Sequence, residues 1–132
     1  MRLIRLLSCF IFIFYTFHET SGQITFTSPE PGTNLHNTET SIIIKLKNAV
    51  KQDFIIDDKI KIHGDKSDFV QFSSLLTEDR KTIIVNPLTA FNYGETIFVE
   101  IESILMENNN FTSLLSYYFQ IKDFEASEKI QT

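Results

Sequence analysis

The stretch from Lys81 to Ser103 (KTIIVNPLTAFNYGETIFVEIES) limits the fold of this 132-residue chain more than any other. It begins with four β-branched residues, Thr82–Val85, whose side chains fit a pleated strand better than a helix. Asn86-Pro87 ends that run because proline has no N–H to donate to a sheet. Phe91–Gly94 has the composition of a turn, and Glu95–Glu102 then alternates apolar and polar residues. The stretch therefore predicts two strands at the centre of an all-β domain.

Five further segments are predicted to be strands, and turn-forming residues separate them. They are 23–28, 40–46, 60–62, 69–75 and 113–121. The polar turn Thr77–Arg80 has hairpin length, so strands 69–75 and 82–85 are expected to be antiparallel neighbours. Seven short strands in about 100 residues are typical of an antiparallel two-sheet β-sandwich, and a small barrel is the alternative.

Apolar residues that alternate within these segments predict the core. They are Ile42, Ile44, Leu46, Ile60, Ile62, Phe72, Ile83, Val85, Ile97, Val99, Ile101, Tyr117 and Phe119. The connection 104–112 contains three asparagines and is expected to be an exposed loop.

The first 22 residues have the layout of a secretory signal peptide. A basic start with Arg2 and Arg5 precedes an apolar run, Leu6–Phe17, which is shorter than the roughly 20 residues of a membrane span. We expect cleavage before Gln23; the alternative is an uncleaved membrane anchor. Cys9 is not expected to be lipidated, because most of the apolar run follows it. The prediction is a secreted, extracellular or cell-surface protein, with the periplasm open, and no stable membrane span after cleavage.

The remaining chain has room for one domain, predicted at 23–122, followed by a polar tail or the start of a linker at 123–132. Without the signal it has 10 basic and 16 acidic residues, a net charge of −6 with both signs interspersed. This distribution excludes a basic surface for nucleic acid. The only cysteine lies in the signal, so the exported chain can form no internal disulfide and no thiolate metal site.

Several short motifs occur along the chain: Ser28–Gly32, the strand Ile42–Leu46, Asp79–Thr82 leading to Asn86-Pro87, the corner Phe91–Gly94 and the last strand with Tyr118-Phe119. Together they resemble the bacterial Ig-like domain of surface-layer and secreted proteins. The resemblance covers Gln23 to about Lys122. It implies an Ig-like β-sandwich that acts as a structural or interaction module at the cell surface. Such domains often accompany others, so the chain could be the N-terminal accessory domain of a larger exported protein.

The start at Ser28–Gly32, followed by an apolar strand, is also similar to the start of the periplasmic copper-carrier family. That similarity implies a histidine ligand at the mature N-terminus, where this chain has Gln23. His36, His63 and Met106 remain, and they are a poor set of ligands for a soft metal.

Calcium is a second metal to consider, because Asp57-Asp58 and Asp65–Asp68 flank the strand at 60–62. Calcium takes six to eight oxygen ligands. Three lysines are interleaved with these acids, which favours a solvated charged rim. We therefore predict no metal site and no cofactor.

Catalytic motifs are absent from the sequence: it has no G-x-S-x-G, no H-E-x-x-H and no glycine-rich phosphate loop. Glu100 and Glu102 share a strand face, where carboxylates usually keep a surface soluble. We therefore predict that the chain is not an enzyme.

Three aromatic residues, Phe98, Phe111 and Tyr118, are expected to point outward and form a candidate partner-binding surface. Exposed aromatic rings can stack on sugars or anchor a protein; the alternative is that they pack beneath a neighbouring loop or domain. The expected function is a non-enzymatic structural or interaction module with a protein or glycan partner at the cell surface. The alternative is a ligand-binding sandwich for glycan or copper.

Overall fold

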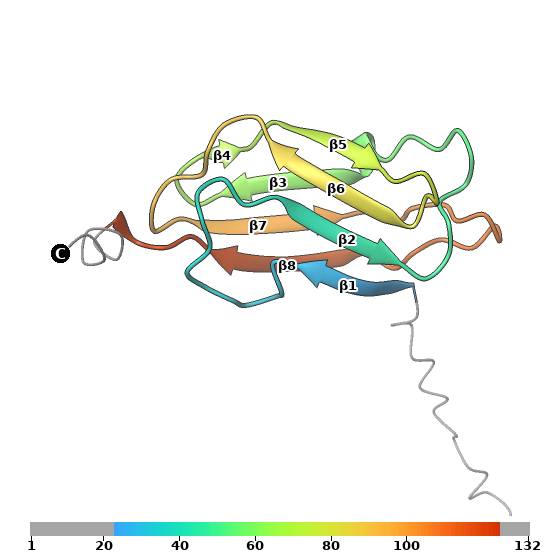
Figure 1. The fold of residues 1–132 in the computed structure, drawn as a ribbon, viewed down its shortest axis with the longest axis horizontal. Coiled ribbons are helices and arrows are strands. Elements are labelled where there is room, and N and C mark those ends of the chain that lie inside the picture. Colours follow the sequence, from blue (N-terminus) through green and yellow to red (C-terminus); the bar gives the residue numbers. More distant parts are fainter. Residues whose placement is uncertain (1–22, 125–132) are drawn as a thin grey trace, which may run out of the picture.

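Two four-stranded antiparallel sheets stack on each other in the computed structural model of this chain (Figure 1). The structure describes residues 23–124, so the predicted signal peptide and residues 125–132 of the predicted tail lie outside the described part. Within it, no helix has the length and apolar character needed to cross a membrane. The strands are β1 (Ile24–Ser28), β2 (Ile42–Leu46), β3 (Ile60–Gly64), β4 (Asp68–Phe69), β5 (Phe72–Leu76), β6 (Thr82–Pro87), β7 (Thr96–Ile101) and β8 (Leu115–Gln120), with a short 3₁₀ helix, η2 (Asp57–Lys59), before β3.

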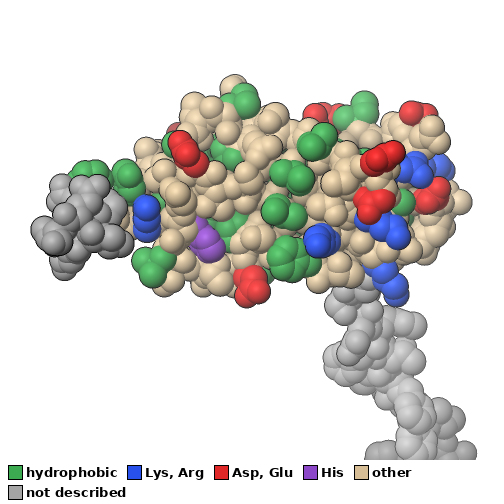
Figure 2. Space-filling view, viewed as in Figure 1, with side chains coloured by type: hydrophobic (Ala, Val, Ile, Leu, Met, Phe, Trp, Pro, Cys, Tyr) green, Lys and Arg blue, Asp and Glu red, His purple; other side chains and the backbone are tan. Residues whose placement is uncertain are grey.

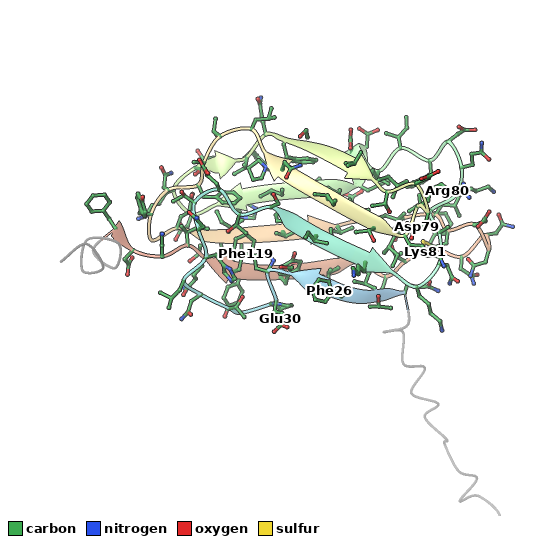
Figure 3. All side chains as sticks on the ribbon, viewed as in Figure 1. Phe26, Glu30, Asp79, Arg80, Lys81 and Phe119 are labelled. Atoms are coloured by element: carbon green, nitrogen blue, oxygen red, sulfur yellow. The ribbon has the colours of Figure 1, made fainter. Side chains whose placement is uncertain are left out.

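The strand order is β1-β2-β6-β5 in one sheet and β4-β3-β7-β8 in the other. The stretch 81–103 supplies β6 and β7, which occupy inner positions in opposite sheets, so it contributes to both halves of the core. The hairpin β5–β6 closes through the predicted turn, where Asp79, Arg80 and Lys81 lie at the right-hand end of the sandwich in Figure 3. The predicted antiparallel β-sandwich is confirmed, and the barrel alternative is wrong because the strands form two separate four-stranded sheets.

The strand predicted at 69–75 is in fact two strands in different sheets, which makes eight strands in place of seven. β4 pairs with β3, and β5 pairs with β6. Between them, the Val70 N–H donates to Ile62 O in one sheet at 2.9 Å, and the Leu88 N–H donates to Gln71 O beside the other at 2.9 Å. Adjacent residues thus bond to opposite sheets, and the chain crosses the sandwich at Val70-Gln71.

The alternation of apolar residues places the core as predicted. Every predicted core residue is buried except Phe72, which is half-buried at the margin. The exposed-loop prediction for 104–112 is wrong in part, because Ile104, Met106 and Thr112 are buried. Met106 forms a β-bridge with Val50, and Thr112 Oγ1 accepts a hydrogen bond from the Ile104 N–H at 2.8 Å. The connection therefore closes one end of the core.

The hydroxyl of Tyr117 is buried and has no hydrogen-bond partner among residues 23–124. Burial raises the pKa of this hydroxyl well above its ordinary value. Because an unpaired buried hydroxyl costs free energy, Tyr117→Phe is expected to raise the free energy of unfolding by up to about 1 kcal/mol. Guanidinium unfolding followed by circular dichroism measures this. A clear loss of stability would show that the hydroxyl has a partner.

A buried carboxylate, Glu95, ties two turns together at one end of the sandwich. The Lys66 and Ser67 N–H groups donate to Glu95 Oε1 at 3.1 and 2.6 Å, and the Ser67 hydroxyl and Asn92 N–H donate to Oε2 at 2.8 and 3.0 Å. Burial alone would raise the pKa of Glu95, but these hydrogen bonds outweigh it and hold the pKa below its ordinary value. A Cβ added at Gly64 would overlap Glu95 Oε1. We refer to Gly64, Lys66, Ser67, Asn92 and Glu95 as the carboxylate clasp.

Candidate functional site

A row of ring side chains crosses the outer face of the sheet β4-β3-β7-β8. Each strand contributes one member, and the register places Phe69 opposite His63, His63 opposite Phe98, and Phe98 opposite Tyr118. All four residues are exposed, and Phe69 is 80% exposed. We call these four residues the aromatic row. It follows from period-two alternation, because the strand residues on either side of Phe98 and Tyr118 are inward core positions.

The rings of the aromatic row lie against one another. His63 and Phe98 are stacked, with centroids 4.9 Å apart and planes inclined by 14°. Phe69 is tilted against His63 at 6.3 Å, and Tyr118 against Phe98 at 6.2 Å. The facing sides of the two central rings are therefore already in contact. The row presents a ridge of ring edges along its middle and more open rings at its two ends.

Charged side chains lie beside the aromatic row, with opposite signs on the two central strands. Lys61 of β3 is opposite Glu100 of β7, and the Glu102 N–H donates to Lys59 O at 2.8 Å, which continues the same register. Lys61 Nζ also donates to Glu102 at 2.9 Å, with Lys59 Nζ 3.9 Å from the same carboxylate. This hydrogen bond raises the pKa of Lys61 and lowers that of Glu102, so both are ionised at neutral pH.

The structure brings together two of the three predicted surface residues. Phe98 and Tyr118 are neighbours in the row, whereas Phe111 lies in the β7–β8 connection, where it forms a β-bridge with Leu105. Phe111 borders a shallow pocket that Lys59 and Glu102 also line, so it lies next to the charged side chains and outside the row itself. Sequence reasoning missed His63 and Phe69. The outward orientation of His63 could have been predicted, because it alternates in step with the polar residues Lys59 and Lys61.

The two histidines considered for copper lie in different surroundings. His36 Nε2 is 2.6 Å from the Thr33 hydroxyl oxygen, and its ring packs edge-on against Phe119 with centroids 5.5 Å apart. Burial lowers the pKa of His36. His63 is stacked in the aromatic row, and Met106 is fully buried. Across residues 23–124, no three His, Cys, Asp or Glu side chains gather closely enough to hold a metal ion.

The acidic groups considered for calcium lie at opposite ends of β3. Asp57 and Asp58 are in η2, just before the strand, and Asp65 and Asp68 follow it. Five residues of strand separate the two groups by roughly 17 Å. Asp57 accepts a hydrogen bond from the Ser74 hydroxyl, and Asp65 accepts one from the Thr96 N–H at 3.1 Å. The fold therefore does not bring these two groups into one site.

A separate groove of about 540 Å³ lies between β1 and the start of β8, lined by residues 23–27, Glu30 and 113–115. Beyond it, the edge of β8 is covered: the Gly32 N–H donates to Tyr118 O, and the Gln120 N–H to Thr33 O. Figure 2 shows the side of the molecule on which β2 and β6 lie in Figure 1. Hydrophobic side chains form several separate patches there and no continuous strip.

No protein-family model matches this chain, and no curated protein sequence matches it. Solved structures do share the fold. CopC from Methylosinus trichosporium OB3b aligns with a TM-score of 0.59 and 10% identity, over 77% of this chain and 94% of that one. PcoC, a copper resistance protein from Escherichia coli, aligns with a TM-score of 0.57 and 14% identity, over 76% and 99%.

A domain of the bacterial S-layer protein SbsC also shares the fold, with a TM-score of 0.53 and 13% identity. The match covers 67% of this chain and 13% of the S-layer chain. At these identities the likeness shows the fold alone. The neighbours are all-β domains of bacterial proteins, in agreement with the bacterial β-sandwich that the sequence motifs predicted.

Proposed function

We propose that this chain is a non-enzymatic, exported β-sandwich module of Ig-like type that contacts a protein partner through the aromatic row. The observation that carries the proposal is the row itself, with Phe69, His63, Phe98 and Tyr118 exposed side by side across one sheet. Contiguous exposed aromatic surface is typical of interaction sites. Export rests on the predicted signal at 1–22, and the S-layer and copper-resistance neighbours support an exported setting. The predicted domain at 23–122 is the unit proposed to act, alone or as an accessory domain of a larger protein.

The ring geometry favours a protein over a glycan. A sugar that stacks on an aromatic side chain needs an open ring face, and the facing sides of His63 and Phe98 already pack against each other. A ridge of ring edges suits apolar side chains of a partner, which can pack between and beside the rings. The charged neighbours Lys61 and Glu100 would form the polar rim that protein interfaces commonly have.

Site-specific photo-cross-linking tests this proposal. A photoreactive phenylalanine analogue is placed at Phe98 or Tyr118 of the full-length chain, with Leu75, exposed on the other sheet, as the matched control position. We expect protein adducts from positions 98 and 118 and none from position 75. Equal adducts at all three positions would refute the row as the contact. Glycan-array binding that disappears in Phe98→Ala would assign the surface to sugars instead.

A non-enzymatic role is proposed because two carboxylates of the described residues, Glu95 and Glu102, are engaged structurally. Glu95 accepts four hydrogen bonds within the carboxylate clasp. Glu102 pairs with Lys59 and Lys61 at the surface.

Copper carriage is the second candidate, favoured by the fold likeness to CopC and PcoC, which covers 77% and 76% of this chain and 94% and 99% of theirs. Against it, His36 and His63 are engaged in separate ring contacts. A titration with Cu(II) decides between the two: uptake by the exported chain no greater than that of a His36→Gln/His63→Gln variant would end the copper candidate.

A further inference from the structure

The charged and aromatic side chains on the outer face of the sheet β4-β3-β7-β8 are arranged in a self-complementary way. On one side lie Lys59, just before β3, and the outward β3 residues Lys61 and His63. Level with them lie Glu102, just after β7, and the β7 residues Glu100 and Phe98. The flanking strands contribute Phe69 and Tyr118 at the level of the ring residues. One central strand is therefore flanked by basic side chains and the other by acidic ones. The aromatic row has a ring side chain at each of its four positions, so a row in the reverse order still places a ring opposite every ring.

We propose that this face binds a second copy of the same chain, face to face, about a two-fold axis that runs between β3 and β7 along the strands. This inference rests on the proposed function, since it names the partner of the aromatic row. Under such an axis β3 of one copy lies over β7 of its partner at the same level. Each lysine then faces a glutamate, and each ring faces a ring. A two-fold interface uses the same patch on both copies, and this face meets that condition.

Lys61 would face the partner's Glu100, and Lys59 would face the partner's Glu102. His63 would face the partner's Phe98, and Phe69 would face the partner's Tyr118. Sheets that pack face to face keep their strands within about 30° of each other, so the pairs nearest the axis are the least disturbed by twist. The intramolecular contacts of Glu102 with the two lysines stay at the surface, where ion pairs are weak and their partners exchange at little cost.

The size of the face predicts a weak dimer. Four strands span roughly 19 Å, and five residues along a strand span roughly 17 Å. Stable interfaces bury about 800 Å² on each partner, which exceeds the area of this patch. We therefore expect a concentration-dependent dimer with a dissociation constant on the order of 100 µM, in which opposite charges set the pairing and the rings supply the buried surface.

Charge reversal followed by mixing tests the pairing directly. Lys59→Glu/Lys61→Glu makes both central strands acidic, and Glu100→Lys/Glu102→Lys makes both basic. By sedimentation velocity, the unaltered chain should dimerise as its concentration rises, each variant alone should remain monomeric, and an equimolar mixture should form a 1:1 heterodimer. Added salt should weaken the heterodimer, because these charge pairs would be only partly desolvated.

Phe98→Ala should weaken self-association about tenfold, because central aromatic residues carry much of the binding energy of an interface. Leu75→Ala on the opposite sheet is the matched control and should have no effect. Unfolding midpoints measured on each variant separate loss of association from loss of fold, and Tyr118→Ala provides a second ring variant.

A monomeric chain at about ten times the expected dissociation constant would overturn the dimer, as would association that Phe98→Ala or the charge reversals leave unchanged. If the chain is monomeric and positions 98 and 118 still cross-link to another protein, the dimer fails and the proposed function stands. If sedimentation shows the dimer and cross-links join two copies of the chain, both proposals are supported.

Discussion

Replacing Phe119 with alanine should lower the free energy of unfolding by about 3–5 kcal/mol, a loss that a domain this small has little reserve to absorb. Phe119 (Figure 3) is fully buried and is the largest of the fully buried side chains. Its ring packs against Phe91 with centroids 6.0 Å apart and against His36. Truncation would leave a cavity where β8 meets the segment that covers its edge, and rigid neighbours refill such a cavity only partly.

Tyr118→Ala is the matched control for Phe119→Ala, because the two aromatic residues are adjacent in β8 and point to opposite faces. Tyr118 is 47% exposed, so its truncation should cost far less. Chemical denaturation of both variants, followed by circular dichroism, measures the difference. Equal losses would mean that the assigned facing of β8 is incorrect.

The second large effect is expected in the carboxylate clasp, where Glu95→Ala should lower the free energy of unfolding by about 3 kcal/mol. The change would remove the acceptor of the Lys66, Ser67 and Asn92 N–H groups at once, and a donor left unpaired in a buried position is expensive. Glu95→Gln should lower the free energy of unfolding by less, because it keeps one oxygen acceptor. Some loss should remain, because its NH₂ group would face N–H and O–H donors. Urea unfolding at neutral pH measures the free energy of unfolding of the unaltered chain, Glu95→Gln and Glu95→Ala, which should decrease in that order.

The clasp also predicts a pH dependence. Its hydrogen bonds depress the pKa of folded Glu95 below the ordinary value of 4.5, so the unfolded chain takes up this proton first as the pH falls. The stability that Glu95 contributes is therefore present above about pH 4.5 and is lost as the pH falls through the folded pKa. The difference in unfolding free energy between the unaltered chain and Glu95→Gln should shrink across that acid range. A constant difference would refute the linkage.

Gly64→Ala gives an independent check on the clasp, because the added Cβ would occupy the position of Glu95 Oε1. It should destabilise the unaltered chain and have a smaller effect in a Glu95→Ala background, where that position is empty. Contacting residues show such non-additivity, and distant ones do not. Simple addition of the two losses would show that Gly64 and Glu95 act separately.

Much of this fold can be predicted from local alternation, because each strand has one buried face. In β7, for example, the order of Ile97, Phe98 and Val99 predicts the inward and outward sides directly. The crossing at Val70-Gln71 could not be predicted, since neither glycine nor proline interrupts the apolar pattern there. The burial of Met106 depends on its bridge to Val50, a contact between distant segments that no local pattern contains.

The candidate site was predictable in part for the same reason. Phe98 and Tyr118 could be assigned to an outward surface one strand at a time. Cross-strand register places them beside His63 and Phe69, and local alternation does not contain that register. The same holds for the position of Phe111 outside the row. Glu95 had a usable signal: it stands just before β7 and shares the parity of Ile97 and Val99, which predicts that its carboxylate points inward.

The carboxylate clasp offers a way to recognise evolutionary relatives of this chain. Structural neighbours share only 10–14% of its sequence, which is too little for overall similarity to separate descent from convergence on a common fold. The clasp instead requires particular residues at particular positions. A glycine is needed at position 64 because the carboxylate of residue 95 fills the space next to it. A distant sequence with Gly-x-x-Ser beginning at the last residue of its third strand and Asn-x-x-Glu before its seventh would be expected to form the same contact, and loss of either half should coincide with loss of the other.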